Sequence, residues 1–460
     1  MAYRSTSPDT IFALSSAPGR AGVAVLRVSG PASRDVVQQI AGCVPDPRTA
    51  ALRTFRDVET GKVIDKGLVV WFPGPGSFTG EDCAEFQVHG GRAVVAAMLG
   101  VFAKIDGCRM AEAGEFACRA FDNGKIDLAQ AEGLADLIDA ETEAQRVQAL
   151  RQAEGALTGL TERWRHELIG AMALVEAGID FSDEGDVSDS AVAQAEEAVA
   201  RLSREILERV DDQNRGEILR EGFQVVLAGA PNVGKSSLLN ALAQRDVAIV
   251  SAQAGTTRDV IEVRLDLGGV PVVISDTAGL REAGDEVERE GMKRTLKRAK
   301  RADLVIWVDD RPIPKLPEAP TGRPERGFGV ELADLSGSAL LVASKADEVD
   351  RSSSGGAAED DYLEVSTKSD LGLKELVERI SGLAVSRAGS GEDSVVTQAR
   401  HRQHIERCLA HLERFAGMRG DIELRAEELR LAADALGRIS GRVDPEDVLD
   451  QVFGRFCIGK

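Results

Sequence analysis

A glycine-rich segment from Gly229 to Ser236 limits the folds open to this chain more than any other part of the sequence. It reads Gly-Ala-Pro-Asn-Val-Gly-Lys-Ser and fits the phosphate-binding pattern G-x-x-x-x-G-K-[ST] at every fixed position. The apolar run 225–227 precedes it as a buried strand would, and residues 237–242 follow with helical apolar spacing. A strand, this loop and a helix in succession predict an α/β nucleotide-binding domain, whereas a glycine-rich turn without a ligand would not need these flanks.

The positions of this loop have separate roles in holding a nucleotide. The glycines let backbone N–H groups and the helix N-terminus converge on a phosphate. Lys235 is expected to reach the β- and γ-phosphates, and the Ser236 hydroxyl to bind Mg²⁺. Asn232 has a side-chain amide suited to a monovalent cation near the β–γ bridge, which would supply the charge that an arginine supplies elsewhere. A loop residue in a strained backbone conformation is an equally good interpretation of Asn232.

Polar segments downstream match the magnesium and γ-phosphate contacts of nucleotide hydrolases. Residues 255–259 form a polar loop in which a threonine can close onto Mg²⁺ and the γ-phosphate. A predicted strand over 270–275 leads to Asp276, which would hold the Mg²⁺ shell, and to Gly279, whose amide would sense the γ-phosphate. Another strand is predicted over 304–308.

Two later segments indicate which base is bound. A predicted strand over 339–343 ends in Ser344-Lys345-Ala346-Asp347, and residues 364–368 would form the last loop over the base. The Asp347 carboxylate can accept two parallel hydrogen bonds from the ring N–H and the exocyclic amine of guanine, a pair that adenine does not offer. These motifs in this order predict a Ras-like GTPase domain. The residues expected to bind GTP are Asn232, Val233, Gly234, Lys235, Ser236, Ser237, Ser251, Ala252, Gln253, Ala254, Gly255, Thr256, Thr257, Asp276, Thr277, Ala278, Gly279, Ser344, Lys345, Asp347, Ser366, Thr367 and Lys368.

Two positions depart from the usual pattern of G proteins. Ser344 stands where asparagine is usual, and its shorter side chain cannot make both contacts of an amide. The loss of one buried hydrogen bond costs about 1 kcal/mol. We therefore expect guanine selection to persist through Asp347 with a several-fold lower affinity. Leu280 stands where many small GTPases place the glutamine that orients the attacking water, so another group must do so. Acidic candidates follow at Glu282, Asp285, Glu286 and Glu288.

Length, charge and cysteine usage bound the remaining functions. A chain of 460 residues is expected to hold about three domains. A net charge of −20 excludes one broad basic face for nucleic acid, so any RNA contact must be local or supplied by a partner. The six cysteines show neither a C-x-x-C pair nor metal-ligand spacing, which suits a reducing cytoplasm. A signal peptide and a membrane-spanning apolar run are not evident, so a cytoplasmic location is expected.

Changes in residue pattern predict a multidomain chain of mixed α+β and α/β class. Short strand-like runs separated by glycine and proline indicate an α+β domain over residues 1–122. Helical apolar spacing over 123–217 resumes over 386–460, on either side of a GTPase domain at 218–385. We therefore expect one helical domain into which the GTPase domain is inserted.

Further motifs extend these observations into a resemblance over nearly the whole chain. They are the segments 9–11, 18–23, 27–30, 78–82, 89–91, 113–116, 127–132, 276–289 and the terminal Phe-Cys-Ile-Gly-Lys at 456–460. On these segments the sequence resembles the MnmE (TrmE) family of tRNA modification GTPases. Ala21 departs from the family, which usually has a second glycine there.

The resemblance implies a folate site and a dimer in the N-terminal part. Family members form homodimers through this domain, which is similar to folate-binding folds and takes a 5-formyl- or 5,10-methylene-tetrahydrofolate. The motifs assign the pocket to Arg27, Glu85, Lys125 and Lys460. Composition alone favours solvated strand residues at Arg27 and Glu85. Cys457 matches a candidate reactive thiol, and a small residue in a packed C-terminus is an equally good interpretation.

The resemblance also implies the chemistry of the GTPase domain. The family hydrolyses GTP with Mg²⁺ and K⁺, and two such domains meet across the dimer. Glu288 matches the residue that orients the water. Ser236 and Thr257 match the Mg²⁺ ligands. The K⁺ site matches Asn232, Ser251, Thr256 and the backbone at Gln253.

The family acts on tRNA with an FAD-dependent partner, MnmG (GidA), in a heterotetramer. Together they install an aminomethyl or carboxymethylaminomethyl group at C5 of the wobble uridine. A regulatory or ribosome-assembly GTPase is the alternative, but it leaves the N-terminal domain and the tail without a role. A folate-dependent one-carbon transferase without tRNA leaves the GTPase unexplained.

Overall fold

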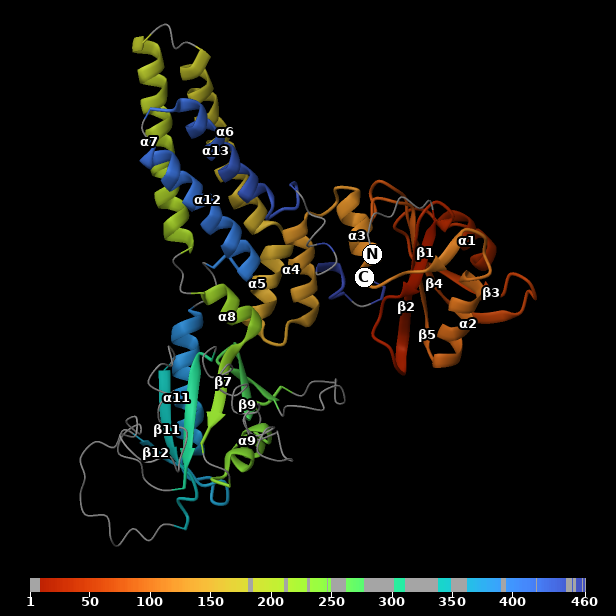
Figure 1. The fold of residues 1–460 in the computed structure, drawn as a ribbon. Helices are drawn as coiled ribbons and strands as arrows, with labels where there is room; N and C mark the ends of the chain where they lie inside the picture. The colour runs from red at the N-terminus through yellow and green to blue at the C-terminus, as the bar shows by residue number, and fades with distance from the viewer. Residues whose placement is uncertain are drawn as a thin grey trace, which may run out of the picture. The chain divides into compact units, whose positions relative to one another are not determined.

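The computed structural model describes residues 9–180, 185–210, 214–229, 232–245, 247–249, 262–276, 302–310, 338–348, 362–389, 394–418, 420–443, 449, 452–456 and 458–459. The chain divides into two compact units, whose helices and strands are labelled in Figure 1. The first unit comprises Met1–Ile138, Leu150–Arg204 and Gln403–Lys460, and the second comprises Asp139–Ala149 and Glu205–Arg402.

A six-stranded sheet forms the N-terminal part of the first unit. Its strands are β1 (Thr10–Leu14), β2 (Ala21–Ser29), β3 (Ala51–Arg56), β4 (Val63–Phe72), β5 (Cys83–Gly90) and β6 (Cys108–Met110). They lie in the order β3-β4-β5-β2-β1-β6, and neighbours are antiparallel except β1 with β6. Helices α1 (Ser33–Ala41) and α2 (Arg92–Phe102) lie beside the sheet (Figure 1). They share one apolar core with it, where the rings of Phe12, Phe86 and Phe102 meet. The predicted α+β class is confirmed.

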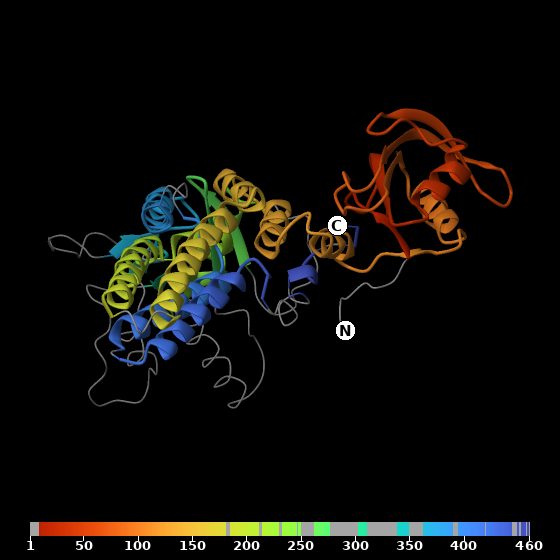
Figure 2. The ribbon, with the colours of Figure 1, turned by 90° about the horizontal axis from the view of Figure 1, so that it is seen from above.

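Helices make up the rest of the first unit. They are α3 (Glu115–Asp122), most of α4 (Leu128–Asp139), the end of α5 (Glu143–Ala153), α6 (Ala156–Asp180), most of α7 (Gly185–Val210), most of α12 (Ala399–Gly417) and α13 (Ile422–Gly437). Figure 2 shows α6, in yellow, beside the blue helices α12 and α13. Arg425 of α13 binds Glu196 of α7 at 2.6 Å, and its guanidinium lies 4.4 Å from the ring centroid of Phe415 on α12. Helices from both ends of the sequence therefore form one bundle.

A second six-stranded sheet organises the second unit. Its strands are β7 (Phe223–Ala228), β8 (Glu262–Leu267), β9 (Val270–Asp276), β10 (Leu304–Asp309), β11 (Ser338–Ala343) and β12 (Tyr362–Glu364). The order is β12-β11-β10-β7-β9-β8, parallel throughout except for the hairpin of β8 with β9. Helices α8 (Arg215–Glu221), α9 (Lys235–Ala243) and α11 (Leu373–Ala388) accompany it. All four strands predicted around the nucleotide motifs are present, so the α/β class is confirmed.

Residues 139–149 join this second unit through polar contacts. Glu141 binds Arg264 of β8 at 2.8 Å. The Gln145 amide donates to the carbonyl oxygen of Arg220 at 3.0 Å, and the Gln148 amide to that of Gly216 at 3.2 Å. The start of α5 is thus held to α8 and to the edge strand β8.

The helices of the described segments include none with the length and apolar character needed to cross a membrane.

Close backbone packing explains one glycine of the family-like motif at 113–116. Gly114 has a φ of 71° and lies just before α3. A Cβ at this position would lie 2.2 Å from the carbonyl oxygen of Phe453. Only glycine accommodates both the positive φ and the close approach of the Phe453 carbonyl oxygen. This close contact packs the C-terminal segment against the start of α3.

We predict that Gly114→Ala destabilises the first unit by at least about 2 kcal/mol, because it adds strain in φ to a steric overlap. Gly100→Ala is the matched control, since Gly100 lies in helix α2 with open space around its Cβ position. That control should be neutral or slightly stabilising. Calorimetric melting of both variants checks this, and equal melting temperatures would refute the packing argument.

Candidate active site

The phosphate loop connects β7 to α9 with a backbone that needs glycine. Gly229 has a φ of 143°, and a Cβ there would lie 2.1 Å from the carbonyl oxygen of Val308. Gly234, with a φ of 102°, caps the N-terminus of α9. Asn232 also has a positive φ, of 65°, so the strained conformation is present whatever its side chain binds. The loop therefore ends at a helix N-terminus, where backbone amides favour anions.

Lys235 is the first residue of α9 and is almost fully buried. Its ammonium donates to the carbonyl oxygen of Gly229 at 2.9 Å, so the side chain folds back over the loop. Burial lowers the pKa of Lys235, while the nearby Asp276 carboxylate acts in the opposite direction. A buried ammonium at a helix N-terminus is suited to bind phosphate oxygens.

Ser236 and Asp276 meet at the carboxyl edge of the sheet. The Ser236 hydroxyl donates to Asp276 Oδ2 at 2.6 Å. The sheet register places Asp276 of β9 beside Leu227 of β7, one residue before that strand ends. Two oxygen ligands at this spacing are the kind of donors that Mg²⁺ prefers.

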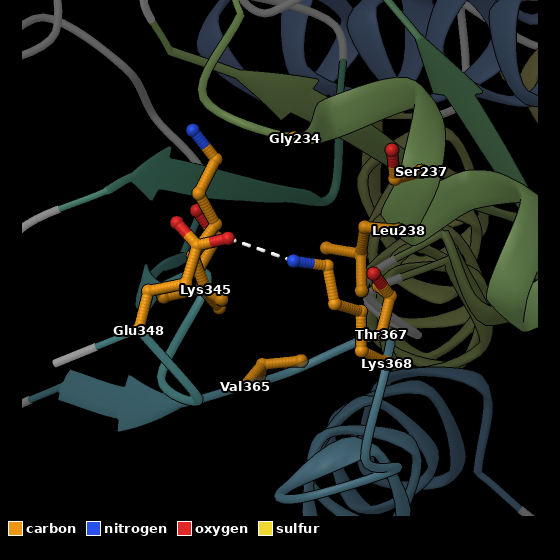
Figure 3. Close-up of a pocket in the computed structure, with 10 residues that line it drawn as sticks. Gly234, Ser237, Leu238, Lys345, Glu348, Val365, Thr367 and Lys368 are labelled. Carbon is orange, nitrogen blue, oxygen red and sulfur yellow. Dashed lines mark hydrogen bonds and ion pairs between the residues drawn. The ribbon is translucent and has the colours of Figure 1, made fainter.

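A cavity of about 190 Å³ opens beside the phosphate loop (Figure 3). Figure 3 shows the side chains of Glu348 and Lys368 facing each other there, joined by an ion pair of 2.7 Å. The residues that line the cavity are Gly234, Ser237, Leu238, Val342, Ser344, Lys345, Glu348, Val365, Thr367 and Lys368. The structure therefore brings the predicted phosphate, guanine and last-loop motifs to one cavity.

Asp347 lies next to this cavity with one oxygen already bound. Its Oδ1 accepts from the Ser366 hydroxyl at 2.6 Å, and Oδ2 lies 3.6 Å from Lys368 Nζ. The Ser366 hydrogen bond is the main reason that the pKa of Asp347 is lowered. The ionised carboxylate that guanine recognition requires is thus held in place.

Several predicted residues lie outside the described segments. They are Ser251, Ala252, Gln253, Ala254, Gly255, Thr256, Thr257, Thr277, Ala278, Gly279, Glu288, Cys457 and Lys460.

The predicted folate residues of the first unit are polar and partly buried. Arg27 and Glu85 are register partners on β2 and β5, with Nη2 and Oε1 2.8 Å apart. The Arg27 guanidinium lies 5.6 Å from the ring centroid of Phe78 and 5.8 Å from that of Phe116. Lys125 donates to the carbonyl oxygen of Pro75, in the β4–β5 loop that carries Phe78. Arg27 and Glu85 are therefore paired with each other across the sheet, and each side chain is 23% exposed.

A buried ion-pair network nearby was missed in the sequence. Arg119, only 2% exposed, donates to Glu81 at 3.1 Å and to Glu115 at 3.0 Å. Arg109 binds Glu115 through both of its terminal nitrogens, at 2.6 and 2.8 Å. Burial raises the pKa of Glu115, but the hydrogen bonds from Arg109, from the Glu112 amide and from Arg119 outweigh it and lower that pKa. The available signal was Arg119, which follows Glu115 by four residues in α3, a spacing that places both side chains on one face of a helix.

The C-terminal tail docks on β1. The Ser15 hydroxyl donates to the carbonyl oxygen of Gly459 at 2.9 Å, and Ile458 pairs with Ala113 in a β-bridge. A Cβ at Gly459 would lie 2.2 Å from the carbonyl oxygen of Leu14. Gly459 therefore lies against the end of β1, and β1 pairs with the strand that carries Arg27.

The described cysteines differ in exposure. Cys43 is exposed, whereas Cys83, Cys118 and Cys408 are buried. Burial raises the pKa of Cys118 and of Cys408 to about 12 in each case. These two thiols are therefore protonated at neutral pH and poor nucleophiles.

We predict that iodoacetamide at pH 8 alkylates Cys43 far faster than Cys118 or Cys408. At a pKa of about 12, only about one thiol in ten thousand is ionised at that pH. Peptide mass spectrometry over time measures the rates, and urea-unfolded protein, in which all thiols should react alike, is the control. Equal rates in the folded protein would contradict the assigned burial. The same spectra report whether Cys457 reacts rapidly.

Comparison with known proteins assigns the chain to a family. The family model "GTP-binding protein TrmE N-terminus" matches residues 10–125, and the model "MnmE helical domain" matches residues 128–457. A tRNA modification GTPase MnmE of Methylobacterium radiotolerans is 49% identical over 98% of this chain and 99% of its own length. Proteins of the same description from Methylobacterium sp. strain 4-46 and Parvibaculum lavamentivorans are each 50% identical over 98% of this chain and all of theirs. The chain therefore belongs to the MnmE (TrmE) family of tRNA modification GTPases.

Proposed function

We propose that this GTPase works with an FAD-dependent partner of the MnmG (GidA) family. The pair installs an aminomethyl or carboxymethylaminomethyl group at C5 of the wobble uridine of certain tRNAs, with the carbon supplied by a tetrahydrofolate. Family membership over 98% of the chain is the observation that supports this most strongly. The net charge of −20 also supports it, because a partner must then provide most of the RNA contact.

The phosphate loop would hold GTP and Mg²⁺ for hydrolysis. Lys235 would bind the β- and γ-phosphates, and Ser236 with Thr257 would hold Mg²⁺, which when bound would supply positive charge to the phosphate oxygens. The fit to Mg²⁺ is supported by the oxygen donors Ser236 and Asp276, 2.6 Å apart. Glu288 orients the attacking water, because Leu280 cannot.

We expect Glu288→Ala to lower kcat by at least about a hundredfold while the dissociation constant for GTP stays within about twofold. An interaction made mainly in the transition state gives this split. Glu282→Ala, in the same acidic run, is the matched control and should hydrolyse GTP normally. Single-turnover hydrolysis measures the rate of the chemical step, and equilibrium binding measures the dissociation constant for GTP. Weak binding with unchanged kcat would make Glu288 a structural residue instead.

Asn232 would hold K⁺ together with Ser251, Thr256 and the backbone at Gln253. Its amide oxygen is a donor suited to an alkali cation. Its position in the phosphate loop, with a φ of 65°, supports this assignment. A cation held there supplies positive charge to the transition state.

Asn232→Ala should lower kcat in K⁺ by at least about tenfold, as expected for the loss of a transition-state charge. The unmodified enzyme should turn over faster in K⁺ than in Na⁺, and the variant should respond equally to both. Asn240→Ala, on the exposed face of α9, is the control and should keep the preference. Equal turnover of the unmodified enzyme in K⁺ and Na⁺ would refute a selective cation site.

The N-terminal sheet would bind the folate between Arg27, Glu85, Lys125 and Lys460. A carboxylate such as Glu85 suits the donor edge of a pterin, and cationic groups suit the glutamyl carboxylates. The pairing of Arg27 with Glu85 supports a preorganised site. The docking of Gly459 on Ser15 supports a tail that brings Lys460 to it.

Removal of residues 457–460 should weaken folate binding by at least about tenfold, as expected for the loss of a charge-assisted contact. GTP turnover should persist, because no phosphate or guanine contact is removed. Calorimetric titration with 5-formyltetrahydrofolate and a GTPase assay are run on the same preparation. Unchanged folate affinity would contradict the placement of Lys460, and lost GTPase activity would show that the tail supports the fold.

The remaining assignments are also proposals. The N-terminal domain spans residues 1–122, the GTPase domain spans 218–385, and the helical domain consists of 123–217 with 386–460. The enzyme is a cytoplasmic homodimer that forms a heterotetramer with its partner. Cysteine usage supports the reducing compartment.

A further inference from the structure

Ser344 occupies a distinctive place in the GTP site. It directly follows strand β11, is 8% exposed and lines the cavity beside the phosphate loop. Its hydroxyl oxygen lies 2.5 Å from the carbonyl oxygen of Val233 in the phosphate loop and 3.1 Å from that of Asp309 at the end of β10. Three separate segments of the nucleotide site therefore meet at this one hydroxyl.

A hydroxyl can donate only one hydrogen bond, which limits how Ser344 can bind a base. A serine has one O–H, and both of its neighbours are carbonyl oxygens that accept hydrogen bonds. Guanine N7 is also an acceptor, so it needs a donor from the protein. The single hydrogen of Ser344 is already used within the protein. An asparagine amide has two N–H donors, so it can bond to the loop and to N7 together.

The opposite edge of guanine is served by other residues. Asp347 offers a carboxylate to the ring N–H and the exocyclic amine, and Ser366 fixes that carboxylate at 2.6 Å. Two lysine ammonium groups at the cavity have carboxylate neighbours, Lys368 with Glu348 at 2.7 Å and Lys345 with Asp310 at 3.7 Å. Both ammonium groups are therefore paired with carboxylates of the protein, and Asp347 is the carboxylate placed to accept from the base.

We propose that Ser344 ties the phosphate loop to strands β10 and β11 and does not bind guanine N7. The enzyme thus distinguishes guanine from adenine at the Asp347 edge and tolerates purines altered at position 7. This proposal rests on GTP being the substrate and specifies how its base is recognised. It also makes Ser344 a positioning residue that acts through the phosphate loop.

The test compares GTP with 7-deaza-GTP, in which a C–H replaces N7, by competition binding to the full-length protein. The unmodified enzyme should bind the two with dissociation constants within about twofold of each other. Ser344→Asn should bind GTP about fivefold more tightly than 7-deaza-GTP, because it adds one hydrogen bond to N7. Discrimination of fivefold or more by the unmodified enzyme would overturn the proposal, as would a Ser344→Asn variant that does not discriminate.

A second variant tests the tether. Ser344→Ala should weaken the binding of GTP and of 7-deaza-GTP by the same factor, about fivefold. The reason is that the carbonyl oxygen of Val233 loses its hydrogen-bond donor. Ser369→Ala, an exposed serine on the neighbouring loop, is the matched control. Unchanged affinity of Ser344→Ala would refute the tether. ATP is included throughout, and equal binding of ATP and GTP by the unmodified enzyme would refute GTP as the substrate without bearing on Ser344.

Discussion

The hydrogen bond between the Ser236 hydroxyl and the Asp276 carboxylate joins the two parts of the chain on which nucleotide chemistry depends. At 2.6 Å it connects the start of α9 to the end of β9, two segments that are 40 residues apart. The parallel order of β11, β10, β7 and β9 makes this possible, because the carboxyl ends of parallel strands share one edge. The phosphate loop, the base cavity and the buried Lys235 are all positioned from this edge.

The first unit is held together in a different way, by a network of ion pairs around a buried arginine. Arg119 is buried and pairs with Glu81 and Glu115, which lie on the β4–β5 loop and on α3. A buried charge is costly unless it is paired, so the loss of one partner destabilises more than the pair contributes. The network therefore fixes the loop that carries Phe78 beside Arg27. Glu81 and Glu115 belong to the matching segments 78–82 and 113–116, to which the resemblance assigned no function. The ion-pair network gives both residues a structural role.

Local patterns predicted the nucleotide domain well, because a buried parallel strand and a phosphate loop each have a short sequence signature. The strands around 225–227, 270–275, 304–308 and 339–343 are present where expected. Contacts between distant residues leave no such signature. Arg119 with Glu81, the attachment of Glu141 to Arg264, and the two carbonyl partners of Ser344 depend on topology that the sequence pattern does not specify. The serine at position 344 was evident in the sequence, but its hydrogen bond to the carbonyl oxygen of Val233 was not.

We propose that this GTPase takes part in modifying the wobble uridine of tRNA. Mass spectrometry of nucleosides from tRNA measures this directly, in cells that lack the gene and in the same cells supplied with the normal protein or with Glu288→Ala. We expect C5-aminomethyl and C5-carboxymethylaminomethyl uridine derivatives to disappear in the deletion and to return with the normal protein but not with Glu288→Ala. An unchanged nucleoside profile in the deletion would contradict it.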